Sequence, residues 1–148
     1  MRVVLDTNIL ARANPYAAGA ARALLDLIRH SDDVVLIVSP FLLAELERVL
    51  NYPRLRALWP LAQSDIAQFV DALQQFAEVV SPGEAEAVIA EDPDDDPVLA
   101  TAVAGRADIV CSLDRHFALP AVAEYARRHQ FEVVSDVELL QRLRRVAR

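Results

Sequence analysis

Short apolar runs alternate with longer amphipathic segments along the whole chain. The runs are short enough for buried strands and span residues 3–5, 34–38, 79–80, 109–111 and 131–134. The segments between them have the helical spacing of apolar residues and span residues 19–28, 41–50, 65–76, 98–104 and 137–146. Alternation of this kind is typical of parallel strands joined by crossover helices. It predicts an α/β fold with a central parallel sheet that is covered on both faces.

Capping residues mark several of the predicted helix starts. Ser39 and Ser81 each precede a proline, which places a capping hydroxyl before a first-turn proline. Ser81 and Ser135 each stand three residues before a glutamate, which is the spacing of a capping box. These positions support the division of the chain into helices and strands.

The size and composition of the chain limit what it can be. No repeat or change in composition marks a boundary, so we expect one domain over residues 1–148. No apolar run approaches the roughly 20 residues of a membrane span, and the N-terminus lacks the layout of a secretory signal. We therefore expect a cytoplasmic protein without a membrane segment. The single cysteine, Cys111, lies in an apolar run and is expected to be a buried thiol rather than a nucleophile.

The charged residues exclude further classes of function. The net charge is -7, which disfavours a nucleic-acid binder that relies on a broad basic surface. All fifteen basic residues are arginine, so mechanisms that need a lysine amine are excluded. A site that handles phosphate through a bound cation remains possible.

Two carboxylates follow predicted strands at places where a plain turn is more usual. Asp6 follows the run at residues 3–5, and Asp114 follows the run at residues 109–111. Asp96 precedes the helical segment that leads to the second of these strands. Carboxyl ends of parallel strands meet at one edge of a sheet, together with the N-termini of the next helices. We therefore expect Asp6, Asp96 and Asp114 at a common edge.

Glu45 is the fourth acid of this set. It lies in the predicted helix at residues 41–50, beside the apolar stripe that contains Leu42 and Leu46. On a helix, Glu47 is rotated by about 200° from Glu45. We expect Glu45 to face inward and Glu47 to face solvent.

Four carboxylates at one edge repel one another, and each raises the pKa of the others unless a cation compensates. Oxygen ligands without histidine or thiolate suit Mg²⁺ or Mn²⁺, which bind a few carboxylates together with water and substrate phosphate. Such an ion activates water and orients a phosphodiester. The acids therefore indicate a metal site that acts on phosphate.

Each acid also has a structural interpretation. Asp96 and Asp114 have the positions of caps for the helix or turn that follows them, and Glu45 is placed to pair with an arginine. The other acids among residues 91–95 are typical of a solvated loop. Asp6 is the hardest to explain in this way, because an unpaired acid at the end of a central strand is costly.

These stretches resemble the PIN-domain ribonuclease family, especially the VapC-like toxin components of bacterial toxin–antitoxin pairs. "VVLDTNIL" resembles the first motif of that family, and "LLAELERVL" resembles its acid-bearing second helix. "DPDDDPVLATAVAGRADIVCSLDRHF" resembles the third and fourth motifs run together. The ordered set spans nearly the whole chain and is specific, although each piece alone is weak.

The resemblance implies a Rossmann-like three-layer α/β/α sandwich and a Mg²⁺- or Mn²⁺-dependent cut in RNA. It also implies a small antitoxin partner and, in many cases, a homodimer. In this sequence the family's acidic quartet corresponds to Asp6, Glu45, Asp96 and Asp114. Asn8 and Ser112 correspond to its supporting polar positions, which hold a ligating carboxylate or water in place.

One position departs from the family's pattern. Many relatives carry another aspartate two residues after the fourth acid, where this chain has His116. We expect His116 to be a surface or packing residue rather than a ligand, so one and two metal ions both remain open. RNA contacts need local positive charge, for which the candidates near the predicted edge are Arg12, Arg48, Arg54, Arg56 and Arg115.

The sequence disfavours several other functions of α/β proteins. A phosphorylated receiver domain needs a lysine near its acids, and the chain has none. A haloacid-dehalogenase-type phosphotransferase needs a second acid two residues after Asp6, where Asn8 stands. Dinucleotide binding needs a glycine-rich turn after the first strand, which is also missing. A non-catalytic PIN-like binding module and a metal-dependent DNA nuclease remain as alternatives.

Overall fold

The computed structural model describes residues 1–83, 88 and 96–147. Five parallel strands form one sheet in the order β3-β2-β1-β4-β5. The strands are β1 (Arg2–Leu5), β2 (Val35–Val38), β3 (Glu78–Val79), β4 (Ile109–Cys111) and β5 (Glu132–Val134). Because β1 is the central strand, Asp6 lies in the middle of the carboxyl edge, as the sequence predicted.

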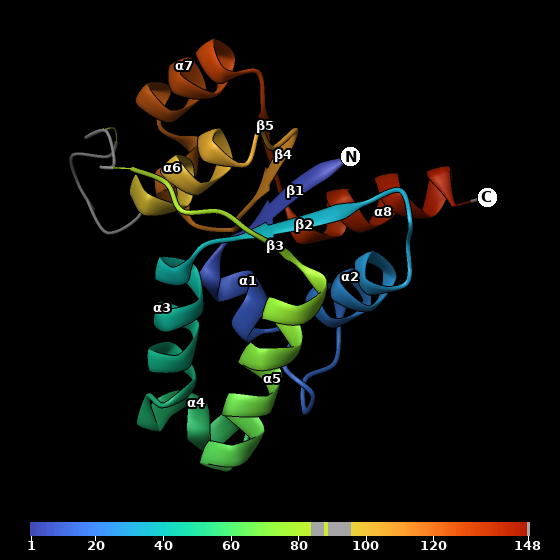
Figure 1. Ribbon diagram of the computed structural model, residues 1–148, viewed down its shortest axis with the longest axis vertical. Coiled ribbons are helices and arrows are strands. Elements are labelled where there is room, and N and C mark those ends of the chain that lie inside the picture. The colour runs from blue at the N-terminus through green and yellow to red at the C-terminus, as the bar shows by residue number, and fades with distance from the viewer. Residues whose placement is uncertain (84–87, 89–95, 148) are drawn as a thin grey trace.

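Helices cover both faces of this sheet. They are α1 (Thr7–Ala11), α2 (Ala20–Arg29), α3 (Pro40–Leu50), α4 (Pro53–Leu58), α5 (Gln63–Phe76), α6 (Asp96–Ala104), α7 (Pro120–His129) and α8 (Asp136–Val146), with a 3₁₀ turn η2 (Arg115–Ala118). Val3 and Leu5 pack against α1, α2, α3, α5 and α8, whereas Val4 packs against α6 and α7 on the opposite face (Figure 1). This alternation along β1 gives two cores, and the predicted three-layer α/β/α sandwich is confirmed.

The start of β1 is fixed at the opposite end of the sheet from Asp6. The Met1 amino group donates to the Asp33 carbonyl at 2.8 Å, and the Arg2 N–H donates to the Asp108 carboxylate at 2.7 Å. In the described part of the chain, no helix is both long and apolar enough to cross a membrane.

A glycine sets the close packing of α6 on the sheet. Gly105 follows the last residue of α6, and a Cβ atom there would overlap the Ile37 side chain of β2. The end of α6 is therefore pressed against the neighbouring strand, which fixes where the start of the same helix lies. Asp96 is the first residue of that helix.

The predicted strands and long helices are found with small shifts at their ends, whereas α1, α4, α7 and η2 were not predicted. Helix α1 has five residues, which is too short to show a helical period. Helix α7 buries only Val122, Tyr125 and Ala126, so the apolar stripe in its sequence is short. The helix start expected at Ser81 is absent at residues 81–83, and Glu84 and residues 91–95 lie outside the described residues.

Candidate active site

Asp6 is the N-cap of α1 and is buried, with 4% of its surface exposed. Its Oδ1 atom accepts a hydrogen bond from the Thr7 N–H at 2.7 Å. Its own N–H continues the sheet by donating to the Cys111 carbonyl of β4 at 2.9 Å. The strand end and the helix start thus hold the backbone of Asp6 on both sides, so its carboxylate has a fixed position at the sheet edge.

Ser112 connects Asp6 to Asp114. The Ser112 hydroxyl donates to Asp6 Oδ2 at 2.8 Å and accepts a hydrogen bond from the Asp114 N–H at 3.0 Å. This bond joins residues that are 106 positions apart in the chain. The structure therefore brings together Asp6, Ser112 and Asp114, three of the residues that the sequence singled out.

Asp114 also caps the 3₁₀ turn η2 that follows it, which is the structural role that its position in the sequence suggested. Its Oδ1 atom accepts a hydrogen bond from the His116 N–H at 2.9 Å, and the His116 ring Nδ1 lies 3.5 Å from the same oxygen. The side chain of Asp114 is 23% exposed, so the carboxylate still reaches solvent. Capping and ligation through the second oxygen are compatible in this geometry.

Asp96 is buried in the first turn of α6, with 5% of its surface exposed. Its Oδ1 atom accepts a hydrogen bond from the Val88 N–H at 3.1 Å. One turn further along α6, the Thr101 hydroxyl donates to the hydroxyl of Ser39, the N-cap of α3, at 2.8 Å. This bond between two buried hydroxyls fixes the helix that carries Asp96 against the helix that carries Glu45.

Glu45 faces inward and Glu47 is exposed, as the helical spacing predicted. The Glu45 side chain is 20% exposed and forms an ion pair with Arg48 at 3.2 Å. The pairing with an arginine that was considered from the sequence is therefore present. Arg48 is 62% exposed, so this contact lies at the surface of the site.

The other predicted residues have different surroundings. Asn8 and Arg115 are exposed, in α1 and η2 respectively. Arg12 ends α1 and has a half-exposed side chain. Arg56 instead donates to the Leu61 carbonyl at 3.1 Å, which gives it a role within the fold.

Asp136 is a buried acid of the same edge that the sequence interpretation missed. It follows β5 and is 2% exposed, and its Oδ1 atom accepts a hydrogen bond from the Val137 N–H at 2.9 Å. Its Oδ2 atom has no hydrogen-bond partner in the described structure and lies 4.0 Å from Arg12 Nη1. The signal was available, because Asp136 follows its strand in the same way as Asp6 and Asp114.

The negative charge of this edge acts on the one cysteine. Cys111 is fully buried, and burial raises the pKa of its thiol to about 12, with the carboxylates of Asp136 and Asp6 adding to the effect. The prediction of a buried thiol is confirmed. The thiol is held in its neutral form beside two anions.

Two hollows lie beside segments that follow the carboxyl ends of the strands. One has a volume of about 360 Å³ and is lined by Ser112, Asp114, Arg115, Ser135 and Glu138, among others. A second, of about 300 Å³, lies between the first turns of α3 and α6. Asp114 lines the first hollow, and none of the four predicted acids lines the second.

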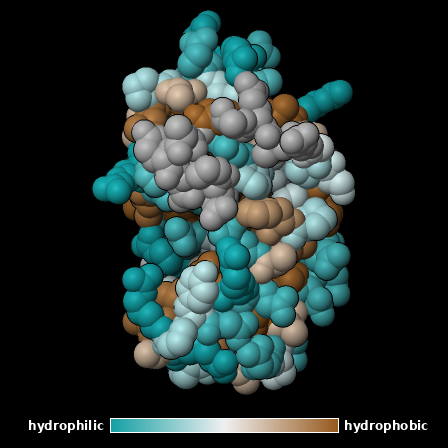
Figure 2. Space-filling model, turned by 90° about the vertical axis from the view of Figure 1, so that its left-hand side faces the viewer, coloured by the Kyte–Doolittle hydropathy of each residue, from teal (hydrophilic) through white to brown (hydrophobic). Residues whose placement is uncertain are grey.

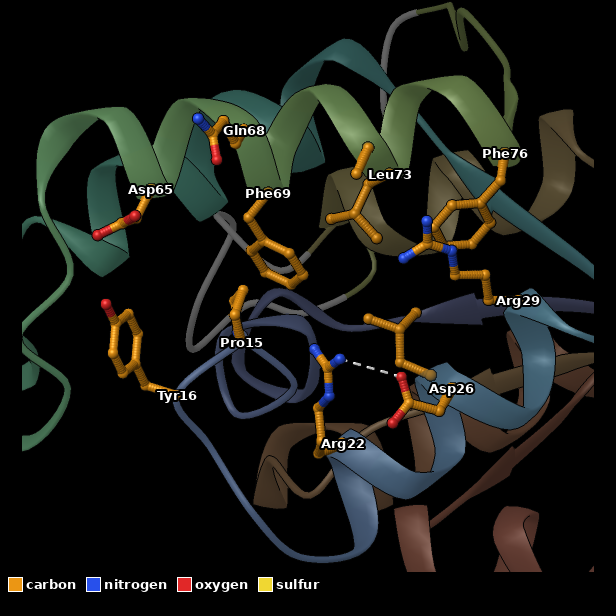
Figure 3. A pocket seen from close by; sticks show the side chains of 12 residues that line it. Pro15, Tyr16, Arg22, Asp26, Arg29, Asp65, Gln68, Phe69, Leu73 and Phe76 are labelled. Atoms are coloured by element: carbon orange, nitrogen blue, oxygen red, sulfur yellow. Dashed lines mark ion pairs between the residues drawn. The ribbon is translucent and has the colours of Figure 1, made fainter.

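A third hollow, of about 290 Å³, lies between α2 and α5 (Figure 3). Phe69 and Leu73 form its apolar wall, and Arg22 and Asp26 pair across its edge at 3.1 Å. None of the four acids predicted for the site lines it. It is therefore separate from the acidic edge.

The carboxyl edge offers oxygen donors for a metal ion. Within residues 1–83, 88 and 96–147, no three histidine, cysteine, aspartate or glutamate side chains are grouped closely enough to hold a metal ion. Mg²⁺ commonly takes only one or two carboxylates and completes its shell with water and substrate phosphate. The oxygen donors of Asp6 and Asp114 fit an ion of that kind, and a closed cage of protein ligands is not present in the described residues.

Comparison with known proteins decides the family. A family model for the PIN domain matches residues 2–116, which contain all four predicted acids. The chain belongs to the PIN-domain family. This PIN domain thus has the fold of a family of nucleases, and its first strand, second long helix and fourth strand lie within the matched range.

A solved structure supports the same fold. The PIN domain is similar to VapBC2 from Rickettsia felis, which was crystallised bound to a DNA fragment from the promoter of the pair. The TM-score is 0.58 at 14% sequence identity, and the match covers 91% of this chain and 98% of that chain. At this identity the likeness concerns the fold. No curated protein matches the chain.

Proposed function

We propose that this PIN domain is a metal-dependent endoribonuclease and the toxin of a toxin–antitoxin pair. Asp6, Glu45, Asp96 and Asp114 are its catalytic acids and the ligands of Mg²⁺ or Mn²⁺, and Asn8 and Ser112 support them. The observation that carries the proposal is the Ser112 hydroxyl, which holds Asp6 at 2.8 Å and links it to the backbone of Asp114. Burying a carboxylate at the end of a central strand is costly, and a bound cation would offset that cost.

The residues at the edge have distinct tasks in this proposal. A bound divalent ion would lower the pKa of the attacking water and offset the charge of the phosphodiester. Asp6 keeps its carboxylate in one orientation because its two oxygens accept hydrogen bonds from Thr7 and Ser112. Ser112 keeps Asp114 at a fixed spacing from Asp6, since it bonds to both. Such outer contacts typically change metal affinity or activity by about 10- to 100-fold when removed.

RNA as substrate and an antitoxin as partner rest on the resemblance to toxin components of this family. The fold is similar to VapBC2, a pair whose structure includes promoter DNA. A homodimer in the cytoplasm is part of the same proposal. The arginines proposed to contact RNA are Arg12, Arg48 and Arg115, which are half-exposed or exposed near the acids.

Cleavage of RNA by purified protein tests the proposal. The wild-type protein, the Asp6→Asn variant and a Glu124→Gln control are incubated with mixed RNA in Mn²⁺ and in chelator, beside single-stranded DNA of the same sequence. We expect cleavage of RNA by wild type and Glu124→Gln in Mn²⁺ only. Equal cleavage in all samples would refute the role of the acids, and cleavage of DNA alone would identify a DNA nuclease. A protein that binds RNA without cutting it in Mn²⁺ would be a binding module.

A further inference from the structure

The hollow between α3 and α6 has an unusual lining for a site beside acids. Its volume is about 300 Å³, and its walls come from the first turns of both helices and from residues 81–83 after β3. Among the described residues, the lining contains two serines and no charged side chain, and its other members are Pro40, Phe41, Pro82, Gly83, Pro97 and Ala100. We call this space the Phe41 hollow. It suits an uncharged, flat and mostly apolar group.

Residues of the Phe41 hollow belong to two helices that carry proposed acids. Pro97 in its wall directly follows Asp96, and Phe41 lies four residues before Glu45, on the same side of α3. The Thr101–Ser39 hydroxyl bond joins the two helices that form the walls. A ligand with one part in the hollow would therefore place the next part of its chain close to the acids.

Phe41 is unusually exposed for an aromatic residue in a helix. It is 38% exposed, and Pro40 before it lies in the first turn of α3. On the side of the molecule where α3 and α6 lie, the atoms that are not drawn in grey form small hydrophobic patches between hydrophilic side chains (Figure 2). Such a surface fits a small ring better than a large apolar partner.

We propose that the Phe41 hollow binds one nucleobase of the RNA strand, stacked on the Phe41 ring, next to the phosphodiester that is cut. This inference rests on the proposed function and adds the contact that holds the substrate. With a net charge of -7, the protein attracts a polyanion weakly. Stacking on an aromatic ring does not depend on that charge, and single-stranded nucleic acids are commonly held in this way.

Binding without cleavage tests the base site. The affinity of a labelled oligoribonucleotide is measured by fluorescence anisotropy in chelator, beside a strand of equal length with abasic positions. The variants are Phe41→Ala, Phe41→Tyr and Tyr16→Ala, a control aromatic that is 56% exposed and lines the separate α2–α5 hollow. Thermal melting of each variant checks that the fold is retained.

We expect Phe41→Ala to weaken binding by about 5- to 100-fold, which is the usual loss for one stacked base. Phe41→Tyr and Tyr16→Ala should bind like wild type, and the abasic strand should not distinguish Phe41→Ala from wild type.

Equal loss on both strands would overturn the proposal. So would unchanged RNA binding by Phe41→Ala, and a changed oligomeric state in that case would identify a second copy of the chain as the occupant. If wild type cuts RNA and Phe41→Ala binds normally, only the base site fails. If wild type neither binds nor cuts RNA, the proposed function fails with it.

Discussion

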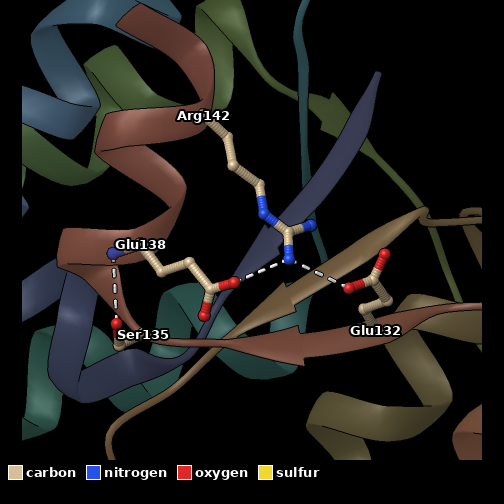
Figure 4. Close-up of polar contacts among 4 residues, drawn as sticks. All are labelled: Glu132, Ser135, Glu138 and Arg142. Carbon is tan, nitrogen blue, oxygen red and sulfur yellow. Dashed lines mark hydrogen bonds and ion pairs between the residues drawn. The ribbon is translucent and has the colours of Figure 1, made fainter. Parts of the chain in front are cut away.

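Carboxylates collect in two regions of this PIN domain, and their partners differ. Between β5 and α8, the Arg142 guanidinium bonds to Glu132 at 3.1 Å and to Glu138 at 2.6 Å (Figure 4). These glutamates are 64% and 50% exposed. At the carboxyl edge, the buried Asp6 accepts hydrogen bonds from a hydroxyl and a backbone N–H.

The difference separates acids that stabilise the fold from acids suited to a ligand. At the β5–α8 surface, the Arg142 guanidinium pairs with both glutamates, so a cation of the protein already offsets part of their charge. Neutral donors at the carboxyl edge orient the Asp6 carboxylate and leave its charge in place. An external cation gains most where the protein has oriented the charge without cancelling it.

Replacing Asp6 should have the largest effect on the rate of RNA cleavage. Replacing it in Asp6→Asn keeps its shape but removes its charge, so RNA cleavage in Mn²⁺ should fall by at least about 100-fold, beyond the loss typical of outer contacts. Glu132→Gln makes the same change at the β5–α8 surface and should leave the rate unaltered. Initial rates with a fluorescent RNA check both variants, and equal losses would remove the distinction between the two regions.

Ser112 offers a test of the hydrogen bonds themselves. Ser112→Ala removes the donor to Asp6 and should lower the cleavage rate by about 10- to 100-fold. Ser135→Ala is the matched control, because its hydroxyl accepts from the Glu138 N–H at 3.1 Å and caps α8. The control should lose about 1 kcal/mol of unfolding free energy and keep its activity. A comparable rate for both variants would show that the Ser112 bond is only structural.

Binding of a metal ion should raise the free energy of unfolding of the protein. At a Mn²⁺ concentration near 100 times the dissociation constant, the unfolding free energy should rise by about 2.7 kcal/mol. The shift in melting temperature should be smaller for Asp96→Asn and unchanged for Glu138→Gln. Differential scanning calorimetry with and without Mn²⁺ measures the three shifts, and identical shifts in wild type and Asp96→Asn would argue against Asp96 as a ligand.

The buried thiol of Cys111 makes the free energy of unfolding depend on pH above about 9. The pKa of Cys111 is raised from 9.0 to about 12, so the unfolded chain loses this proton first as pH rises. Stability from this group is complete below pH 9 and is lost between pH 9 and about 12. Chemical denaturation from pH 8 to 11 should show this decline in wild type and a weaker one in Cys111→Ala. A parallel decline in both proteins would assign it to other groups.

The smallest expected effect is at the β5–α8 surface. Arg142→Ala removes contacts that are screened by solvent, so the melting temperature should change less than for Ser135→Ala. The cleavage rate should be the same as that of wild type. A large loss of activity in Arg142→Ala would mean that this surface belongs to the substrate site.

The strands and long helices of the three layers could be predicted because the spacing of apolar residues and the capping residues are local properties of the sequence. The positions of Asp6 and Asp114 followed from their places after strands, and the inward side of Glu45 followed from helical geometry. Helix α1 was not predicted because it gains its stability from packing under β1 rather than from a periodic pattern of its own.

Contacts between distant segments were beyond what the sequence could give. The bond from Ser112 to Asp6 crosses 106 positions, and the Ser39–Thr101 bond crosses 62. The Phe41 hollow likewise combines three segments that no motif connects. Asp136 was within reach of the sequence because it follows β5, but the sequence analysis did not single it out.

The absence of lysine has a practical consequence together with the course of β1. None of the 148 side chains carries a primary amine, and the Met1 amino group lies at the opposite end of β1 from Asp6. A dye ester therefore reacts with the Met1 amino group and leaves the side chains around the acids unmodified. The labelled molecule can report on binding at the carboxyl edge without a chemical group placed there.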